Sequence, residues 1–182
     1  MKITIITMLL FCLFSISTAF AKAPIRTIEG TVTKVSDGNT IQVTDNRGTK
    51  LKVILYGIDA PETEKGNKRT GKMSEQGQPF GDNARQALEE MVAKKYVRLE
   101  VMAIDQSRRT VAIVWVVDKI VNKEMLKYGW AWAYRQHLDS PYASEYIQLE
   151  EQARNERRGL WEQNNPQPPW EFRKLQKKGK QK

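Results

Sequence analysis

The sequence has almost none of the residues that form disulfides or bind soft metal ions. Its 182 residues include one cysteine, Cys12, and one histidine, His137. A disulfide needs two cysteines, and zinc sites combine several cysteine, histidine or acidic ligands. Internal disulfides, zinc–thiolate sites and histidine metal clusters are therefore excluded. Any chemistry at this protein's site must come from carboxylates and basic residues.

The sequence also lacks an apolar run long enough for a membrane span. The apolar stretch Ile3 to Phe14 falls well short of the roughly 20 residues that a spanning helix needs. It follows Lys2 and precedes Ala19-Phe20-Ala21, a layout typical of a signal peptide cleaved after Ala21. An uncleaved anchor is the alternative. We expect a secreted or periplasmic protein with no membrane attachment after cleavage.

Charge is abundant and unbalanced, with 30 Lys and Arg against 21 Asp and Glu and a formal net charge of +9. Such an excess of cations attracts polyanions. The basic stretch from Arg173 to Lys182 has little apolar content, so it is expected to be a solvated tail that could add phosphate contacts. The chain length suits one domain, and the predicted organisation is a signal peptide at 1–21, a folded domain at 22–165 and a basic tail at 166–182.

Two groups of β-rich segments indicate a small barrel. The first group is Thr27–Val35, Asn39–Thr44 and Leu51–Tyr56, separated by the turn sequences Asp37-Gly38 and Asp45-Asn46-Arg47-Gly48. The second is a hairpin of Val97–Ile104 and Thr110–Val117 that turns at Asp105 to Arg108. Five short strands are typical of a closed barrel.

Three helices are predicted beside these strands. From Pro79 onward, Ala84, Ala87, Leu88, Met91 and Val92 fall on one helical face. Two more helices, Val121–Tyr128 and about Ser144–Arg158, are followed by glycines that can adopt a left-handed cap, Gly129 and Gly159. The polar stretch between Glu62 and Pro79 is expected to be a surface loop. The fold class is therefore α+β.

Several motifs, in this order, resemble the staphylococcal nuclease (thermonuclease) family over nearly all of residues 27–161. They are Tyr56-Gly57-Ile58-Asp59-Ala60-Pro61-Glu62, Arg108-Arg109-Thr110-Val111-Ala112, Val121-Asn122 leading to Gly129, and Glu151, Ala153, Arg154 and Arg157 followed by Gly159-Leu160-Trp161. Pro168-Pro169-Trp170-Glu171 also resembles a tail of some members. The resemblance implies a five-stranded OB-fold barrel with three helices.

The resemblance also implies a nuclease site at the acidic turn. The residues matching Asp59 and the Ala60 carbonyl bind one Ca²⁺, an ion that prefers oxygen ligands. The residue matching Glu62 orients or deprotonates the attacking water, and the one matching Arg109 contacts the scissile phosphate, where a guanidinium can bind two oxygens. Tyr134 is expected to match an aromatic residue of the nucleotide pocket.

Two positions depart from the family pattern. The family's Asp-Gly-Asp-Thr is here Asp37-Gly38-Asn39-Thr40, so a metal-binding carboxylate is replaced by the neutral oxygen of Asn39, which predicts weak Ca²⁺ binding. Ile54 stands where the family has a second phosphate-binding arginine. Lys52, on the same strand face, and Arg108, beside Arg109, are candidates to compensate for that loss.

The sequence therefore leads to two functional hypotheses. The first is an exported, Ca²⁺-assisted nuclease that hydrolyses DNA, RNA or both without sequence preference, as a monomer with no obligate protein partner. The second is a catalytically impaired barrel that only binds nucleic acid through basic loops and aromatic side chains. A structural export factor is a third and more distant reading.

Overall fold

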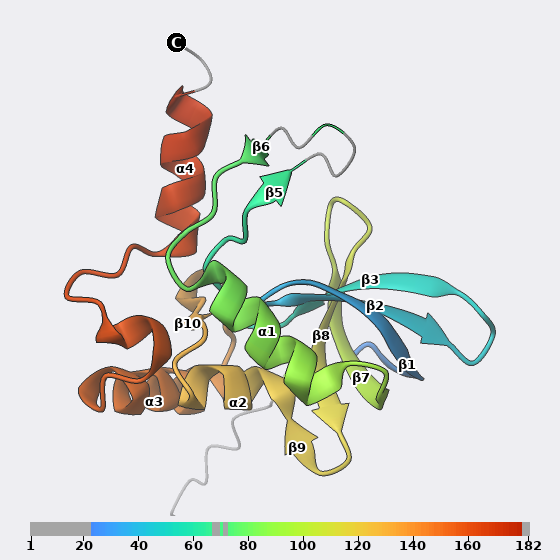
Figure 1. The fold of residues 1–182 in the computed structure, drawn as a ribbon. Coiled ribbons are helices and arrows are strands. Elements are labelled where there is room, and N and C mark those ends of the chain that lie inside the picture. Colours follow the sequence, from blue (N-terminus) through green and yellow to red (C-terminus); the bar gives the residue numbers. More distant parts are fainter. Residues whose placement is uncertain (1–22, 67–69, 71–72, 180–182) are drawn as a thin grey trace, which may run out of the picture.

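The computed structural model describes residues 23–66, 70 and 73–179, so the expected signal peptide lies outside the described residues (Figure 1). Its centre is a barrel of five strands: β1 (Arg26–Asp37), β2 (Thr40–Asp45), β3 (Lys50–Leu55), β7 (Tyr96–Ile104) and β8 (Thr110–Val116). They pair in the order β3-β2-β1-β7-β8, and a parallel pairing of β3 with β8 closes the barrel. The short β9 (Lys119–Ile120) pairs antiparallel with the end of β8. The predicted five-stranded OB-fold barrel is confirmed.

Alternating apolar residues build the barrel interior. Val32, Ile41, Val53, Leu99 and Val114 come from five different strands and are almost completely buried. The long strand β1 has register shifts against β2, and bulges of this kind bend a strand. The bent β1 pairs with β2 along one half and with β7 along the other, which places the end of β1 at one rim of the barrel.

The three expected helices are present: α1 (Gly81–Val92), α2 (Val121–Lys127) and α3 (Tyr142–Asn155). Helix α1 buries Ala84, Leu88 and Val92 against the barrel, and α2 and α3 pack together on the side shown at lower left in Figure 1. Gly129 follows α2 with a φ of 73°, the left-handed value expected of its cap. Helix α3 ends at Asn155, three residues earlier than expected, and Arg157, with a φ of 52°, takes the left-handed position that was expected of Gly159.

A buried asparagine joins α2 to the closing strands. The side chain of Asn122 is fully buried, accepts a hydrogen bond from the Val114 amide and donates to the Tyr56 carbonyl, each at 2.9 Å. A buried amide must be paired in this way to offset its desolvation. Asn122 therefore connects the start of α2, β8 and the end of β3.

The C-terminal stretch differs from the expected solvated tail. Residues Pro169–Gly179 form a fourth helix, α4, while residues 180–182 lie outside the described part. Trp170 packs on the cluster of Trp132, Ala153, Leu160 and Trp161, so the helix is held by tertiary contacts that composition alone does not predict.

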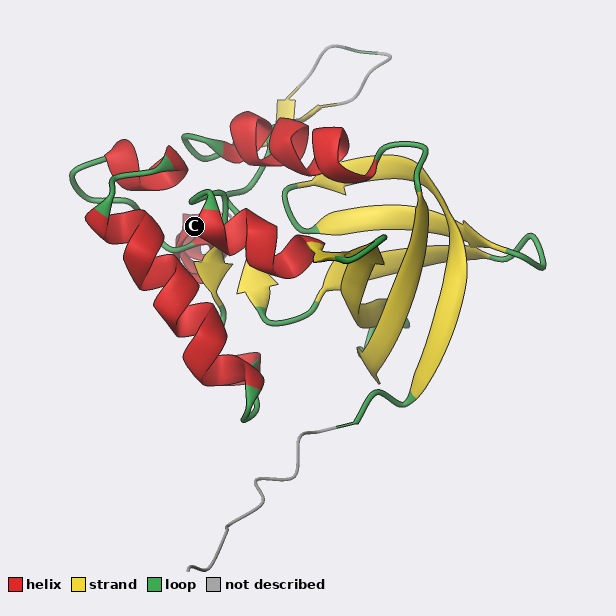
Figure 2. Ribbon diagram, turned by 90° about the horizontal axis from the view of Figure 1, so that it is seen from below, coloured by secondary structure: helices red, strands yellow, loops and turns green. Residues whose placement is uncertain are grey.

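Short strands complete the fold. Two form a hairpin in the stretch expected to be a loop, β5 (Lys65–Gly66) and β6 (Met73–Glu75), and two others pair elsewhere, β4 (Ile58–Asp59) and β10 (Trp132–Ala133). Figure 2 shows the barrel on one side of the molecule and most of the helices on the other. No helix within the described residues has the length and apolar character needed to cross a membrane.

Candidate active site

The acidic turn leaves the barrel at the end of β3 and is fixed by a strand from a distant part of the chain. In the β4–β10 pairing, Asp59 lies opposite Trp132 and Ile58 lies opposite Ala133. The Tyr134 amide donates to the Gly57 carbonyl at 2.8 Å and extends this pairing. The backbone carrying Asp59 is thus held on a rigid element, as a catalytic or binding side chain requires.

Two glycines allow neighbouring segments to approach the turn. A Cβ atom at Gly38 would lie 2.6 Å from the Ala60 Cβ and 2.8 Å from the Ala84 Cβ. A Cβ atom at Gly81 would lie 2.1 Å from the Glu62 carbonyl oxygen. Any other residue at these positions would clash, so the two glycines bring the β1–β2 turn and the start of α1 against the acidic turn.

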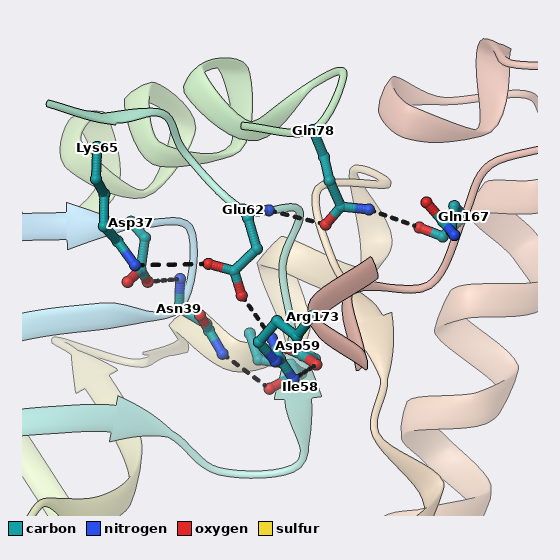
Figure 3. Close-up of polar contacts among 9 residues, drawn as sticks. All are labelled: Asp37, Asn39, Ile58, Asp59, Glu62, Lys65, Gln78, Gln167 and Arg173. Atoms are coloured by element: carbon teal, nitrogen blue, oxygen red, sulfur yellow. Dashed lines mark hydrogen bonds and ion pairs between the residues drawn. The ribbon is translucent and has the colours of Figure 1, made fainter. Parts of the chain in front are cut away.

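The carboxylates of Asp59 and Glu62 share a single guanidinium (Figure 3). Arg173 Nη2 lies 2.7 Å from Asp59 Oδ2, and its Nη1 lies 3.1 Å from Asp59 Oδ1 and 2.6 Å from Glu62 Oε1. Lys65 Nζ is 3.8 Å from the other Glu62 oxygen. Asp59 is 4% exposed, and this burial raises the pKa of its carboxyl although Arg173 acts in the opposite direction. Arg173 is thus a cation that both carboxylates share.

The backbone of Glu62 is held by Gln78, which sequence reasoning did not single out. The Glu62 amide donates to Gln78 Oε1 at 3.0 Å, and the Gln78 amide donates to the Glu62 carbonyl at 2.8 Å. Gln78 Nε2 in turn donates to the Gln167 carbonyl at 3.0 Å, just before α4 (Figure 3). One side chain thus links the candidate base to the C-terminal segment.

Asp37 and Asn39 lie beside Asp59 at the β1–β2 turn. The Asn39 amide donates to Asp37 Oδ1 at 3.0 Å, and Asn39 Nδ2 donates to the Ile58 carbonyl at 3.2 Å. Because Nδ2 is used in this way, Oδ1 is the atom of Asn39 that could bind a cation. Burial raises the pKa of Asp37, and the negative charge of Glu62 adds to this shift.

A pocket of about 690 Å³ contains most of the residues predicted for the site. Its walls include Asn39, Lys52, Asp59, Glu62, Arg109 and Tyr134, together with Asp37, Ile54 and Arg173. Ile54 and Lys52 both come from β3, which agrees with the shared strand face expected for them. Two predicted residues do not line the pocket: Ala60 has its side chain in the barrel core, and Arg108 is exposed in the β7–β8 turn.

Asp105 holds Arg109 at the rim of this pocket. Asp105 Oδ2 accepts a hydrogen bond from Arg109 Nε at 2.6 Å, and Oδ1 accepts one from the Arg109 amide at 2.8 Å. Because Nε is bound, the terminal nitrogens of the guanidinium are the donors that could bind a phosphate. Asp105 was predicted only as part of a turn, and its role in positioning Arg109 was missed.

Tyr134 contacts two other rings. It stacks on Trp170 of α4 with centroids 5.3 Å apart and an interplanar angle of 28°, and the His137 ring lies 4.8 Å away. An aromatic residue in such a pocket can stack on a nucleotide base. Trp170 takes that position on Tyr134 in this structure.

The donor set of the pocket suits a hard cation. Asp59, Asp37 and Glu62 supply carboxylate oxygens, and the guanidinium of Arg173 already binds two of these groups as a cation. The described part of the chain has no cluster of three or more Asp, Glu, His and Cys side chains arranged to hold a metal ion. A Ca²⁺ ion here would therefore also need the oxygen of Asn39, backbone carbonyls and water, all of which calcium accepts.

The chain is similar to proteins that are described as nucleases. A family model described as staphylococcal nuclease homologue matches residues 52–163. The chain is 36% identical over 146 residues to an uncharacterized endonuclease of Haemophilus influenzae, covering 80% of this chain and 73% of that one. It is 33% identical over 157 residues to the micrococcal nuclease of Shigella flexneri, covering 81% and 82% of the two chains. A probable staphylococcal-like nuclease of Oryza sativa subsp. japonica, CAN1, is 32% identical over 83% of this chain and 42% of its own.

Proposed function

The chain belongs to the staphylococcal nuclease family, and on this basis we propose that it hydrolyses phosphodiester bonds of DNA, RNA or both. The observation that carries the proposal is the convergence of Asp59, Glu62 and Arg109 on one pocket, with Lys52 in the same wall. A pair of carboxylates beside two basic side chains, Lys52 and Arg109, is suited to binding a phosphate and activating water. No base-reading motif is needed for nonspecific cleavage, and we propose that the protein acts as a monomer.

We assign the reaction steps to side chains of this pocket. Glu62 takes a proton from a water molecule whose oxygen attacks phosphorus, the phosphorus–oxygen bond to the leaving nucleotide breaks, and the leaving oxygen takes a proton from solvent water. Arg109 binds non-bridging phosphate oxygens and offsets the negative charge that develops on them. Lys52 adds a point charge from β3, in place of the bidentate arginine that Ile54 has replaced.

We propose that the pocket binds one Ca²⁺ weakly, through Asp59, the Asn39 amide oxygen and the Ala60 carbonyl. When bound, the ion would supply positive charge that polarises the phosphate. The neutral amide at position 39 lowers the charge of the ligand set, which favours low affinity.

We also propose that the protein is exported, because the N-terminal sequence has the layout of a signal peptide with cleavage after Ala21. Cell fractionation with N-terminal sequencing tests this: the exported protein should begin at Lys22. A protein that keeps Met1 and stays in the cytoplasm would contradict it.

Cleavage of denatured DNA and of RNA, in Ca²⁺ and in chelator, tests the enzymatic proposal. The Glu62→Gln variant should lower kcat on the order of 10²–10⁴-fold, the usual contribution of a general base. The matched control is Glu64→Gln, which removes the same charge from an exposed side chain two residues away. Equal activity of wild type and the Glu62→Gln variant would overturn the proposed role of Glu62.

A nucleic-acid-binding barrel without catalysis is the second candidate, favoured by Ile54 in the pocket wall and the amide at Asn39. It predicts binding without cleavage under all metal conditions. Binding in either case should weaken steeply with salt, because it rests on release of counterions from phosphates.

A further inference from the structure

Helix α4 covers the candidate site, and its Arg173 lies on the same carboxylates that the proposed metal would need. The three contacts between Arg173 and the pair Asp59 and Glu62 are all 3.1 Å or shorter. Both Asp59 oxygens are used in these contacts, which leaves them satisfied without a metal ion. Each carboxylate oxygen has a second lone pair, but a divalent cation bound there would lie beside the positively charged guanidinium, and the two like charges repel each other. Arg173 and a divalent cation therefore compete for Asp59.

The electrostatics make this contact strong while leaving it reversible. Both terminal nitrogens of Arg173 donate to the carboxylates of Asp59 and Glu62, and charge-assisted contacts of this kind are stronger than hydrogen bonds between neutral groups. The Asp59 side chain is 6% exposed, whereas that of Arg173 is 41% exposed. A buried, charged Asp59 without a neighbouring cation would be destabilising, whereas the partly exposed Arg173 can turn into solvent when another cation takes its place.

The start of α4 is anchored independently of Arg173. Trp170 lies edge-on to Trp132 with ring centroids 5.7 Å apart, and it stacks on Tyr134. The backbone just before the helix accepts the hydrogen bond from Gln78. Residues three apart lie on the same helix face, so docking of Trp170 directs Arg173 into the pocket. The same helix therefore covers the aromatic ring expected to bind a base and the carboxylates expected to bind the metal.

We propose that α4 is a self-inhibitory element in which Arg173 competes with the divalent cation for Asp59 and Glu62. This inference rests on the proposed metal site. In the closed state Arg173 binds the two carboxylates, and binding of the metal ion releases Arg173 from them. Because a competing state lowers apparent affinity by the fraction of protein that is open, a closed state favoured ten to one would weaken metal binding about tenfold.

Calcium binding measured by titration calorimetry, without substrate, tests the competition. The Arg173→Ala variant should bind Ca²⁺ about tenfold more tightly than wild type. The matched control is Lys174→Ala, which removes the same charge from the next, exposed position of α4. Its affinity should change no more than about twofold, because the lysine acts only through screened, long-range charge. The Ca²⁺ affinity of the Arg173→Lys variant should lie between those of wild type and Arg173→Ala, since lysine keeps the charge but loses the bidentate contact.

Melting temperature in chelator and in Ca²⁺ covers the case in which Arg173→Ala folds poorly without metal. Calcium should raise the melting temperature of this variant more than that of wild type, because tighter binding to the folded state gives more stabilisation. Equal or weaker Ca²⁺ binding by Arg173→Ala, or the same tightening in Lys174→Ala, would overturn the competition and leave the nuclease proposal intact. Absence of Ca²⁺ binding in every variant would overturn both the competition and the proposed metal site. Loss of cleavage alone, with the affinity change present, would count against the nuclease only.

Discussion

Gln78 binds both backbone polar groups of Glu62: its side-chain Oε1 accepts from the Glu62 amide at 3.0 Å, and its backbone N–H donates to the Glu62 carbonyl at 2.8 Å. An alanine at position 78 would keep the second bond and lose the first. We expect Gln78→Ala to lower kcat for nucleic-acid cleavage about tenfold to a hundredfold, because small displacements of a catalytic group have costs of this size. KM should change little, since Gln78 does not line the main pocket. Steady-state kinetics on denatured DNA would measure both constants.

Gln86→Ala is the control for this change, because Gln86 is on α1 and its side chain donates along the same helix, to Glu90. It should retain the kcat of wild type. If Gln78→Ala also has the kcat of wild type, the Gln78 side chain is not needed to position Glu62, and the contact at Gly81 and the β4–β10 pairing are sufficient.

Asp105 should act on substrate through Arg109. The Asp105→Asn variant keeps the shape of the side chain but weakens the charge-assisted hydrogen bond to Arg109 Nε. We expect a rise in KM and a fall in kcat/KM of roughly tenfold, because the guanidinium loses its fixed orientation. Asp118→Asn, at the β8–β9 turn, is a charge-matched control that should leave both constants unchanged. A variant of Asp105 with wild-type kinetics would show that Arg109 needs no such support.

The same aspartate predicts a pH dependence of stability. Burial would raise the pKa of Asp105, but hydrogen bonds from Arg109 and Ser107 outweigh it and lower the pKa from its ordinary 3.8. A carboxyl whose pKa is lowered by folding stabilises the native state above its unfolded pKa and loses this contribution as the pH falls through the folded value. The difference in unfolding free energy between wild type and Asp105→Asn should therefore be constant from about pH 5 to 7 and shrink below about pH 4. Urea titrations across that range would measure it, and a difference that grows toward acid pH would contradict the assignment.

Restoring the two family residues should increase cleavage. Ile54 lines the pocket and Asn39 lies beside Asp59, so the double variant Asn39→Asp, Ile54→Arg gives the proposed metal ligand at position 39 a negative charge and adds a phosphate-binding group. Each preorganised group of this kind contributes on the order of 10²–10³ in rate, and we expect at least about a tenfold rise in kcat/KM. Cleavage with Ca²⁺ by the double variant alone would identify wild type as a binding protein. Absence of cleavage by both wild type and the double variant would overturn the enzymatic proposal.

Asn122 should matter for stability and not directly for chemistry. Asn122→Ala removes the partners of the Val114 amide and the Tyr56 carbonyl, two buried groups. We expect a loss of about 2–4 kcal/mol in unfolding free energy, because each buried polar group left unpaired costs about 1–3 kcal/mol. Asn83→Ala, on the exposed face of α1, should change it by less than about 0.5 kcal/mol. Equal losses in the two variants would show that Asn122 makes no special contribution.

The barrel and three helices could be predicted because their signals are local. Strands alternate apolar and polar residues, Gly38 and Gly48 mark turns, and Gly129 follows α2 at positive φ. These features need no knowledge of distant residues. The acidic turn was identified by the order of residues around Asp59, and its structural support came from β10, more than seventy residues later.

Helix α4 and its contacts could not be predicted in the same way. The segment around Arg173 is highly charged, and such composition indicates solvation unless a tertiary partner is known. Its partners are Trp132, Tyr134, Asp59 and Glu62, all far away in the sequence. Gln78 and Asp105 were missed for a similar reason, because glutamine before a helix and aspartate in a turn have no distinctive pattern.

The parallel pairing of β3 with β8 also bears on how the protein folds. Val53 pairs with Thr110, and the β5–β6 hairpin, helix α1 and strand β7 lie between these two residues in the sequence. Pairings between segments so distant in sequence must overcome the entropy of closing a long loop, and proteins that depend on them fold slowly for their size. The closing seam, bridged by Asn122, should therefore form late in the folding transition, after the β1–β2–β3 meander, whose turns are short and local.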